Sequence, residues 1–166
     1  MSQLALYGTA IAFSFIAWGL VAGRYLWPAL RGRSNADALR PLLTLHTFRF
    51  VGLAFLVPGV VSPDLPAAFA NPAGYGDLAA SILALLALAT GLQTTLGIAL
   101  VWAFNLWGTA DLLFAIYQGN RVGLQPGQLG ATYFIVIVLV PLLIITHGLV
   151  FRLLLRTSAA ATPGPT

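Results

Sequence analysis

The chain has 166 residues, of which 59% are hydrophobic and only 7% are charged. A soluble domain usually carries about 25% charged residues, so this composition excludes a water-soluble globule and indicates an integral membrane protein in contact with the lipid bilayer. The net charge of +4 rests on eight basic residues, all arginine, which are too few for an extended phosphate-binding face and exclude nucleic acid as a partner. Cysteine is absent, which excludes disulfides and thiolate metal sites.

A membrane-spanning helix needs about 20 apolar residues, and residues 4–23 form the first such segment. An arginine-rich loop, 24–40, separates it from a second predicted span at 41–61. The next segment, 62–76, is rich in proline and glycine and predicts a loop that folds over the end of the bundle or covers a ligand as a lid. Asp77 follows this loop at the position where we expect a helix N-cap.

Residues 77–118 would form a helix about 63 Å long, roughly twice the thickness of a bilayer. The polar run Thr90–Thr95 therefore predicts a turn between a third span, 78–92, and a fourth, 96–117. A fifth span is predicted at 131–151, and residues 157–166 are expected to be a disordered tail. The sequence thus predicts one all-α domain over residues 1–156, a polytopic transmembrane bundle of about five helices, with four helices as the alternative.

The arginines predict the orientation of this bundle. Four of them lie in or beside the first loop, at positions 24, 31, 33 and 40, so this loop is expected in the cytoplasm. With five spans, Arg152 and Arg156 also lie on the cytoplasmic side, and only Arg121 lies outside. The positive-inside rule therefore favours five spans, with the N-terminus outside and the C-terminus in the cytoplasm.

Three segments together resemble a group of small, uncharacterised, multi-pass bacterial membrane proteins. These segments are RFVGLAFL at 49–56, PAGYGD at 72–77 and WAFNLWGTADLLFA at 102–115. They match that group's RxxGxxFL element, PAGxGD loop and WN-G-DL-type element, although Ala103 and Phe104 separate the tryptophan from Asn105. The resemblance implies a location in the bacterial inner membrane and supplies no activity.

Two histidines, His46 and His147, are the only ones in the chain. Both are predicted about 6–8 Å inside the cytoplasmic ends of their spans, at similar depth on different helices. A pair of imidazoles facing each other across a bundle can ligate a haem iron or another metal. The alternative is that each histidine has a structural role and hydrogen-bonds a neighbouring helix.

Ionisable side chains inside a membrane are costly, so they point into the bundle and find partners. Arg49 shares a helical face with His46, and its predicted depth is close to that of Asn105. We expect a buried Arg49–Asp111 ion pair bridged by Asn105, and Thr109 lies on the same face as Asn105. This predicted polar cluster could lock helices together, conduct ions or protons, or bind a ligand.

Two glycines and one proline predict features of helix packing and helix shape. Gly19 and Gly23 form a GxxxG match, which permits close helix contact within the chain or between copies. Pro141 is expected to kink the last span, because it removes a hydrogen bond to the carbonyl of Ile137.

These features favour a non-enzymatic role, as an accessory or structural membrane subunit or as a binder of a lipid-like molecule. One alternative is a haem b electron-transfer protein that uses His46 and His147 as ligands. The other is a small conduit for ions, protons or solutes built around Arg49 and Asp111. A partner membrane protein or a homo-oligomer is compatible with each of these functions.

Overall fold

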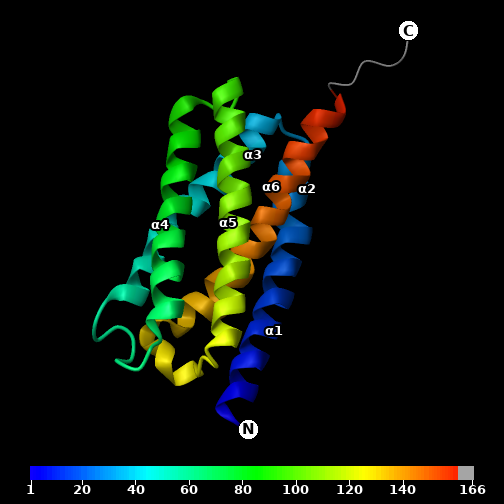
Figure 1. Ribbon diagram of the computed structural model, residues 1–166. Helices are drawn as coiled ribbons and strands as arrows, with labels where there is room; N and C mark the ends of the chain where they lie inside the picture. The colour runs from blue at the N-terminus through cyan, green and yellow to red at the C-terminus, as the bar shows by residue number, and fades with distance from the viewer. Residues whose placement is uncertain (161–166) are drawn as a thin grey trace.

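The computed structural model describes residues 1–160 as an all-helical bundle, with no strand among them (Figure 1). The side chains of residues 1–156 are described. Ten helical elements follow one another, including π-helical and 3₁₀ segments labelled η: α1 (Gln3–Val21), η1 (Ala22–Leu26), α2 (Trp27–Arg31), α3 (Asn35–His46), η2 (Thr47–Leu56), α4 (Ala67–Thr90), α5 (Thr95–Arg121), η3 (Pro126–Thr132), η4 (Ile135–Leu139) and α6 (Val140–Ala160). Helix α6 continues into the predicted tail, of which residues 161–166 lie outside the described part of the chain.

Five helical segments in the described part are long and apolar enough to cross a membrane. They are Gln3–Arg31, Asn35–Leu56, Ala67–Thr90, Thr95–Arg121 and Ile135–Arg156. The prediction of an all-α bundle with about five spans is therefore confirmed as a fold class. The five segments are compatible with insertion in a lipid bilayer.

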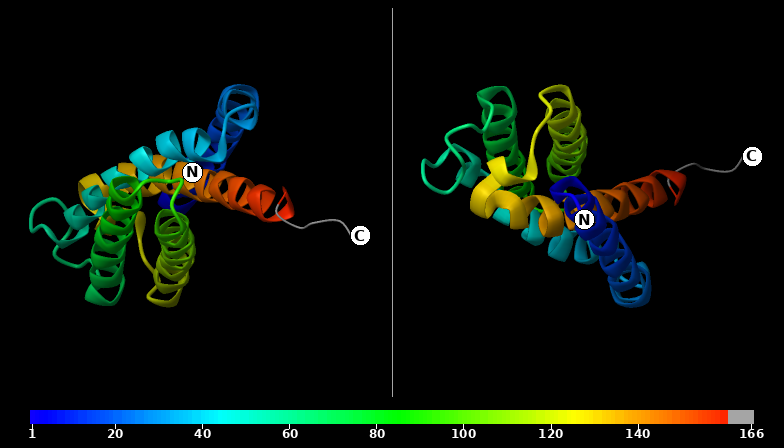
Figure 2. Two further views of the ribbon diagram at one scale, coloured as in Figure 1. Left: turned by 90° about the horizontal axis from the view of Figure 1, so that it is seen from above. Right: turned by 90° about the horizontal axis from the view of Figure 1, so that it is seen from below.

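The helices form a core of four segments with a fifth at its side. Helices α4 and α5 are an antiparallel hairpin that packs against η2, and α3 and α6 complete the core (Figures 1 and 2). Helix α1 lies at the periphery, where it packs mainly on α6 and η4, and no residue of its most apolar window is buried. The N-terminus and the end of α6 lie at opposite ends of the bundle (Figure 1).

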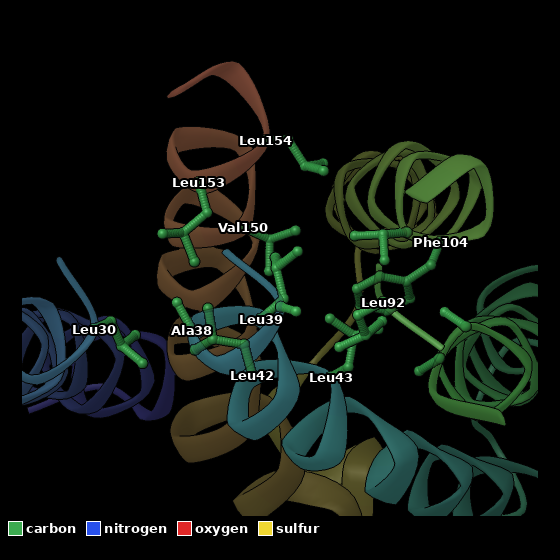
Figure 3. Packing of buried hydrophobic residues seen from close by; sticks show 14 residues of the cluster. Leu30, Ala38, Leu39, Leu42, Leu43, Leu92, Phe104, Val150, Leu153 and Leu154 are labelled. Atoms are coloured by element: carbon green, nitrogen blue, oxygen red, sulfur yellow. The ribbon is translucent and has the colours of Figure 1, made fainter. Parts of the chain in front are cut away.

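Two apolar clusters hold the core. The first, at the end where α3 begins, contains Leu39, Leu43, Phe104 and Leu153 (Figure 3). The second, at the opposite end, is built around Phe55, Phe69, Ala73 and Leu129. Along α3 and η2, His46 and Arg49 lie between Leu43 of the first cluster and Phe55 of the second, so polar side chains occupy the middle of the bundle.

Helix α4 begins earlier than the sequence suggested. The segment 62–76 was expected to be a loop, but Ala67 already starts the helix, and Pro72, Gly74 and Gly76 are inside it. Pro72 lacks an N–H for the carbonyl of Ala68, and Gln118 of α5 supplies the missing bond, with Nε2 donating to that carbonyl at 3.0 Å. A tertiary contact therefore makes the proline compatible with a helix.

The predicted N-cap role of Asp77 is wrong for the same reason. Asp77 lies in the interior of α4, ten residues after its start at Ala67, and is buried. Its carboxylate pairs with Arg49 instead of capping a helix.

The second span also begins earlier than expected and changes its winding halfway. Ser34 caps α3, with its hydroxyl accepting from the N–H of Asp37 at 3.3 Å, and the helix becomes a 3₁₀ helix from Thr47. With three residues per turn, side chains at i and i+3 eclipse one another. The buried residues of η2 are Arg49, Gly52 and Phe55, which this winding aligns along one inward face.

The turn between α4 and α5 lies inside the polar run 90–95. Gly91 adopts φ +86°, a conformation that favours glycine. Thr94 then caps α5, because its hydroxyl accepts from the N–H of Gly97 at 2.9 Å. These local signals explain why the apolar stretch 77–118 is divided between two helices.

The last span starts with an irregular segment rather than a regular α-helix. Residues Ile135–Leu139 are π-helical and end shortly before Pro141. The indole of Trp18 in α1 donates to the carbonyl of Val138 at 3.0 Å. Helix α1 thus contributes a hydrogen bond to the part of the last span where the proline perturbs regular helical bonding.

Candidate functional site

Arg49 is the centre of a buried polar network in the middle of the bundle. Its side chain is 0% exposed and contacts three other helices. The guanidinium Nε donates to Asp77 Oδ1 of α4 at 2.7 Å, and Nη2 donates to Asp111 Oδ2 of α5 at 2.6 Å. Nη1 donates to the carbonyl of Gly108 at 3.3 Å. Both ion pairs are therefore charge-assisted hydrogen bonds in a site that excludes most water.

His147 of α6 joins this network through Arg49. Its Nε2 lies 3.0 Å from Arg49 Nη1, and a guanidinium can only donate. Nε2 must therefore accept, which places the ring proton on Nδ1. Nδ1 then donates to Asn105 Oδ1 at 2.7 Å, so His147 is neutral and oriented by partners on both sides.

His46 contacts His147 but belongs to a separate hydrogen-bonded pair. The two ring centroids are 4.3 Å apart, and His46 Nε2 lies 3.0 Å from Thr146 Oγ1. Among the described side chains, His46 Nδ1 is the buried polar atom with no hydrogen-bond partner. Direct ring contact leaves no space for a porphyrin between the histidines, and both nitrogens of His147 are already engaged with the protein. This geometry does not fit a haem with His46 and His147 as axial ligands.

Three glycines make the close approach of these side chains feasible. A Cβ at Gly52 would meet the Asp77 carboxylate, and one at Gly76 would meet the Asp111 carboxylate. A Cβ at Gly108 would lie 2.6 Å from both Arg49 Nη1 and His147 Nε2. Each of η2, α4 and α5 therefore supplies one charged side chain and one glycine that accommodates a charged side chain from a neighbouring element.

A cavity of about 370 Å³ opens beside the two carboxylates. Its walls come from α1, η2, α4, α5 and the start of the last span, and most of the lining side chains are apolar. Representative wall residues are Ile11, Phe55, Leu112, Val136 and Ile144. Asp77 and Asp111 also line it, and their side chains are 12% and 9% exposed.

The structure brings some of the predicted site residues together and separates others. Arg49 and Asp111 are in contact, as described above. Asn105 does not bridge them; it reaches Arg49 only through His147, and its Nδ2 donates to the carbonyl of His147 at 3.4 Å. Thr109 is outside the network, because its hydroxyl donates to the carbonyl of Asn105 on its own helix at 2.7 Å.

Asp77 is the charged member of the network that the sequence did not reveal. The signal was present, since Asp77 and Asp111 are the two formal charges in the long apolar stretch 77–118. The proline and glycines before Asp77 predicted a loop, which placed the carboxylate at the membrane surface rather than in the bundle. Gly52 and Gly76 carried no signal of their own, because a glycine that accommodates a neighbour is recognisable only in the tertiary structure.

The described residues contain no group of three or more histidine, cysteine, aspartate or glutamate side chains that could hold a metal ion. One oxygen of each carboxylate is bonded to Arg49, both ring nitrogens of His147 are bonded to Arg49 and Asn105, and one ring nitrogen of His46 is bonded to Thr146. The cluster is thus an ion-pair and hydrogen-bond network rather than a set of convergent metal ligands.

The fold and the site together define a helical-bundle protein with five potential membrane spans and an arginine-centred network at its middle. A family model described as a domain of unknown function (DUF8737) matches residues 6–155. The chain belongs to this family, and the matched range includes every residue of the network. No curated protein and no solved structure matches the chain.

Proposed function

We propose that this protein is a non-enzymatic, multi-pass membrane protein that binds a lipid-like molecule in the cavity beside Asp77 and Asp111. The observation that carries the proposal is the cavity itself, whose volume of about 370 Å³ lies within the range of about 300–1,000 Å³ common for ligand sites. Its apolar walls and small number of polar groups are typical of a site for an amphiphile. The buried network holds the two carboxylates in place at the cavity wall.

The location that we propose is the bacterial inner membrane, with the N-terminus outside. Six arginines support this orientation, since they lie in and around the connection between α2 and α3 and near the end of α6, which would face the cytoplasm: Arg24, Arg31, Arg33, Arg40, Arg152 and Arg156. The resemblance to small bacterial membrane proteins supports the choice of membrane. An accessory role beside a partner protein is compatible with ligand binding.

The two other functions weighed from the sequence have less support. A haem protein would need a gap between His46 and His147, whose ring centroids are 4.3 Å apart. A proton conduit through the cluster would have to pass Arg49, and a guanidinium does not release its proton in proteins. Ligand binding needs neither of these and uses the cavity as it is.

The proposal is tested by filling the cavity. Ala115 lines it, so Ala115→Phe should occupy the space that a bound molecule needs. Ala89→Phe adds the same bulk at an exposed position of α4 that does not line the cavity, and serves as the matched control. The wild-type protein and both variants are purified in mild detergent and examined by native mass spectrometry for a bound small molecule.

We expect the wild type and Ala89→Phe to retain an adduct of lipid-like mass that Ala115→Phe loses. An adduct that persists unchanged in Ala115→Phe would place the bound molecule elsewhere. The absence of an adduct from the wild type, even after incubation with bacterial lipid extract, would refute the proposal.

A further inference from the structure

The buried network has one more negative charge than positive charge. Arg49 faces two carboxylates, Asp77 and Asp111. His147 adds no positive charge, because its Nε2 accepts from Arg49. In a largely buried site an uncompensated charge is costly, so we expect one proton or one cation to neutralise the surplus.

The hydrogen bonds of the two carboxylates indicate where the surplus negative charge lies. Arg49 engages Asp77 Oδ1 and Asp111 Oδ2. The other oxygens, Asp77 Oδ2 and Asp111 Oδ1, accept no N–H or O–H from the described residues and lie against Gly52 and Gly76. The Asp111 side chain is only 9% exposed, and both aspartates line the cavity. Two acceptor atoms without donors are therefore available to whatever occupies this space.

The walls of the cavity restrict the chemistry of the rest of the occupant. Apart from the two aspartates, the polar lining side chains are those of Tyr7 and Asn120. Neither carries a positive charge, and the guanidinium of Arg49 lies behind the carboxylates rather than among the lining residues. An anionic head group would meet two carboxylates with no free cation, which is unfavourable in a low-dielectric site.

We infer that the occupant of this cavity is an amphiphile with an ammonium head group, which takes the place of one proton at the carboxylate pair. The ammonium donates to the free oxygens of Asp77 and Asp111, and its apolar chain lies against the walls formed by α1 and α5. One positive charge enters and one proton leaves to the solvent, so the charge of the site stays balanced. This inference rests on the proposed function, because it names the class of ligand for the same cavity.

The exchange makes binding dependent on pH. Raising the pH from acid to neutral removes the competing proton and strengthens binding, while an alkylammonium stays protonated over this range. The titratable and charged groups that face the site, one from each element packed against it, are Tyr7, Arg49, Asp77, Asp111 and His147.

The experiment compares three probes that have the same alkyl chain: octylammonium, octanol and octanoate. Binding is measured by isothermal titration calorimetry on the intact protein in mild detergent, with Ala115→Phe as the control for partition into micelles. We expect octylammonium to bind at least about tenfold more tightly than octanol, which corresponds to about 1.4 kcal/mol. Octanoate is expected to bind most weakly, and octylammonium binding should strengthen as the pH rises.

The variant Asp111→Asn tests the role of the carboxylates. It keeps the shape of the side chain and removes the surplus charge, so octylammonium should lose its advantage over octanol. If this variant does not fold, the probe series and the pH dependence on the wild-type protein decide the question without it.

The outcomes separate the two proposals. If octanol binds as tightly as octylammonium and Ala115→Phe abolishes both, the cavity binds lipid-like molecules without preference for a cation, and the inference fails alone. If the heats of all three probes are the same in the wild type and in Ala115→Phe, only micelle partition is present, and the proposed function fails together with the inference.

Discussion

At the scale of single residues, Arg49 is the side chain through which η2 contacts three other helices of the bundle. Its guanidinium bonds to side chains or carbonyls of α4, α5 and α6, and its own backbone belongs to η2. Removing one member of a buried ionic network leaves the others unpaired, which is strongly destabilising, whereas replacing all members with neutral side chains costs far less.

Arg49→Met is therefore expected to lower the free energy of unfolding by about 3–5 kcal/mol. When Asp111→Asn is added to Arg49→Met, the free energy of unfolding should recover only in part, since Asp77 stays buried without its partner. When both Asp77→Asn and Asp111→Asn are added, the triple variant should regain most of the free energy of unfolding that Arg49→Met loses. Unfolding by titration with sodium dodecyl sulfate in mixed micelles, followed by circular dichroism, measures the three variants. Equal stability of the double and the triple variant would contradict the pairing of Arg49 with Asp77.

The glycines give a second prediction at this scale. Gly76→Ala should destabilise the protein by on the order of 1–3 kcal/mol, because the added methyl group would meet the Asp111 carboxylate. Gly19→Ala in α1 is the matched control, since nothing lies within 4 Å of its Cβ position, and alanine favours a helix by about 0.5–1 kcal/mol. The two substitutions are compared by their melting temperatures in detergent. Equal melting temperatures would show that Asp111 does not occupy the space at Gly76.

At the scale of elements, the first turns of α4 depend on a side chain from another helix. The carbonyl of Ala68 has no donor within α4 because Pro72 lacks an N–H, and Gln118 of α5 supplies one. The same segment carries Gly74 and Gly76, so its helical form also provides the surface on which Leu56 and Asp111 pack.

Gln118→Leu should lower the free energy of unfolding by about 0.5–1.5 kcal/mol, because the carbonyl of Ala68 loses the hydrogen bond that Gln118 donates to it. The same substitution in a Pro72→Ala background should cost less, since the backbone N–H restored at position 72 can then donate to this carbonyl within the helix. A double-mutant cycle of unfolding free energies measures the difference. Additive effects of the two substitutions would contradict a role of Gln118 in compensating for the proline.

At the scale of the whole molecule, the charges define two unlike ends. The connection between α2 and α3 and the end of α6 lie at one end, and the connection between η2 and α4 lies at the other (Figure 1). At the first end, Arg156 links α6 to α2, because its Nη1 donates to the carbonyl of Arg31 at 2.8 Å. In a membrane, these ends should face opposite compartments.

The absence of cysteine makes this orientation directly testable with single cysteines. Gly32→Cys and Asp64→Cys place thiols at exposed positions in the two opposite connections. In intact cells, a membrane-impermeant maleimide should label the cysteine at position 64, and it should label the one at position 32 only after permeabilisation. The reverse pattern would invert the proposed orientation, and labelling of both positions in intact cells would contradict an odd number of spans between them.

Composition and hydropathy determined the class of the fold, because burial of apolar surface in lipid requires long apolar helices whatever their neighbours are. The same logic identified Arg49 and Asp111 as residues that must find partners, since isolated charges inside a membrane are too costly. The polar run at 90–95 predicted a turn, because Gly91 and the cap residue Thr94 act through local backbone geometry.

Only the tertiary structure decided the helical state of residues 67–76, because the donor that compensates for Pro72 comes from Gln118, about fifty positions away in the chain. It also decided that Arg49 has two aspartate partners, since the 3₁₀ winding of η2 sets the direction of its side chain. The cavity has the same origin: its walls come from segments far apart in the chain. Periodicity cannot predict such arrangements where nearly every face of every helix is apolar.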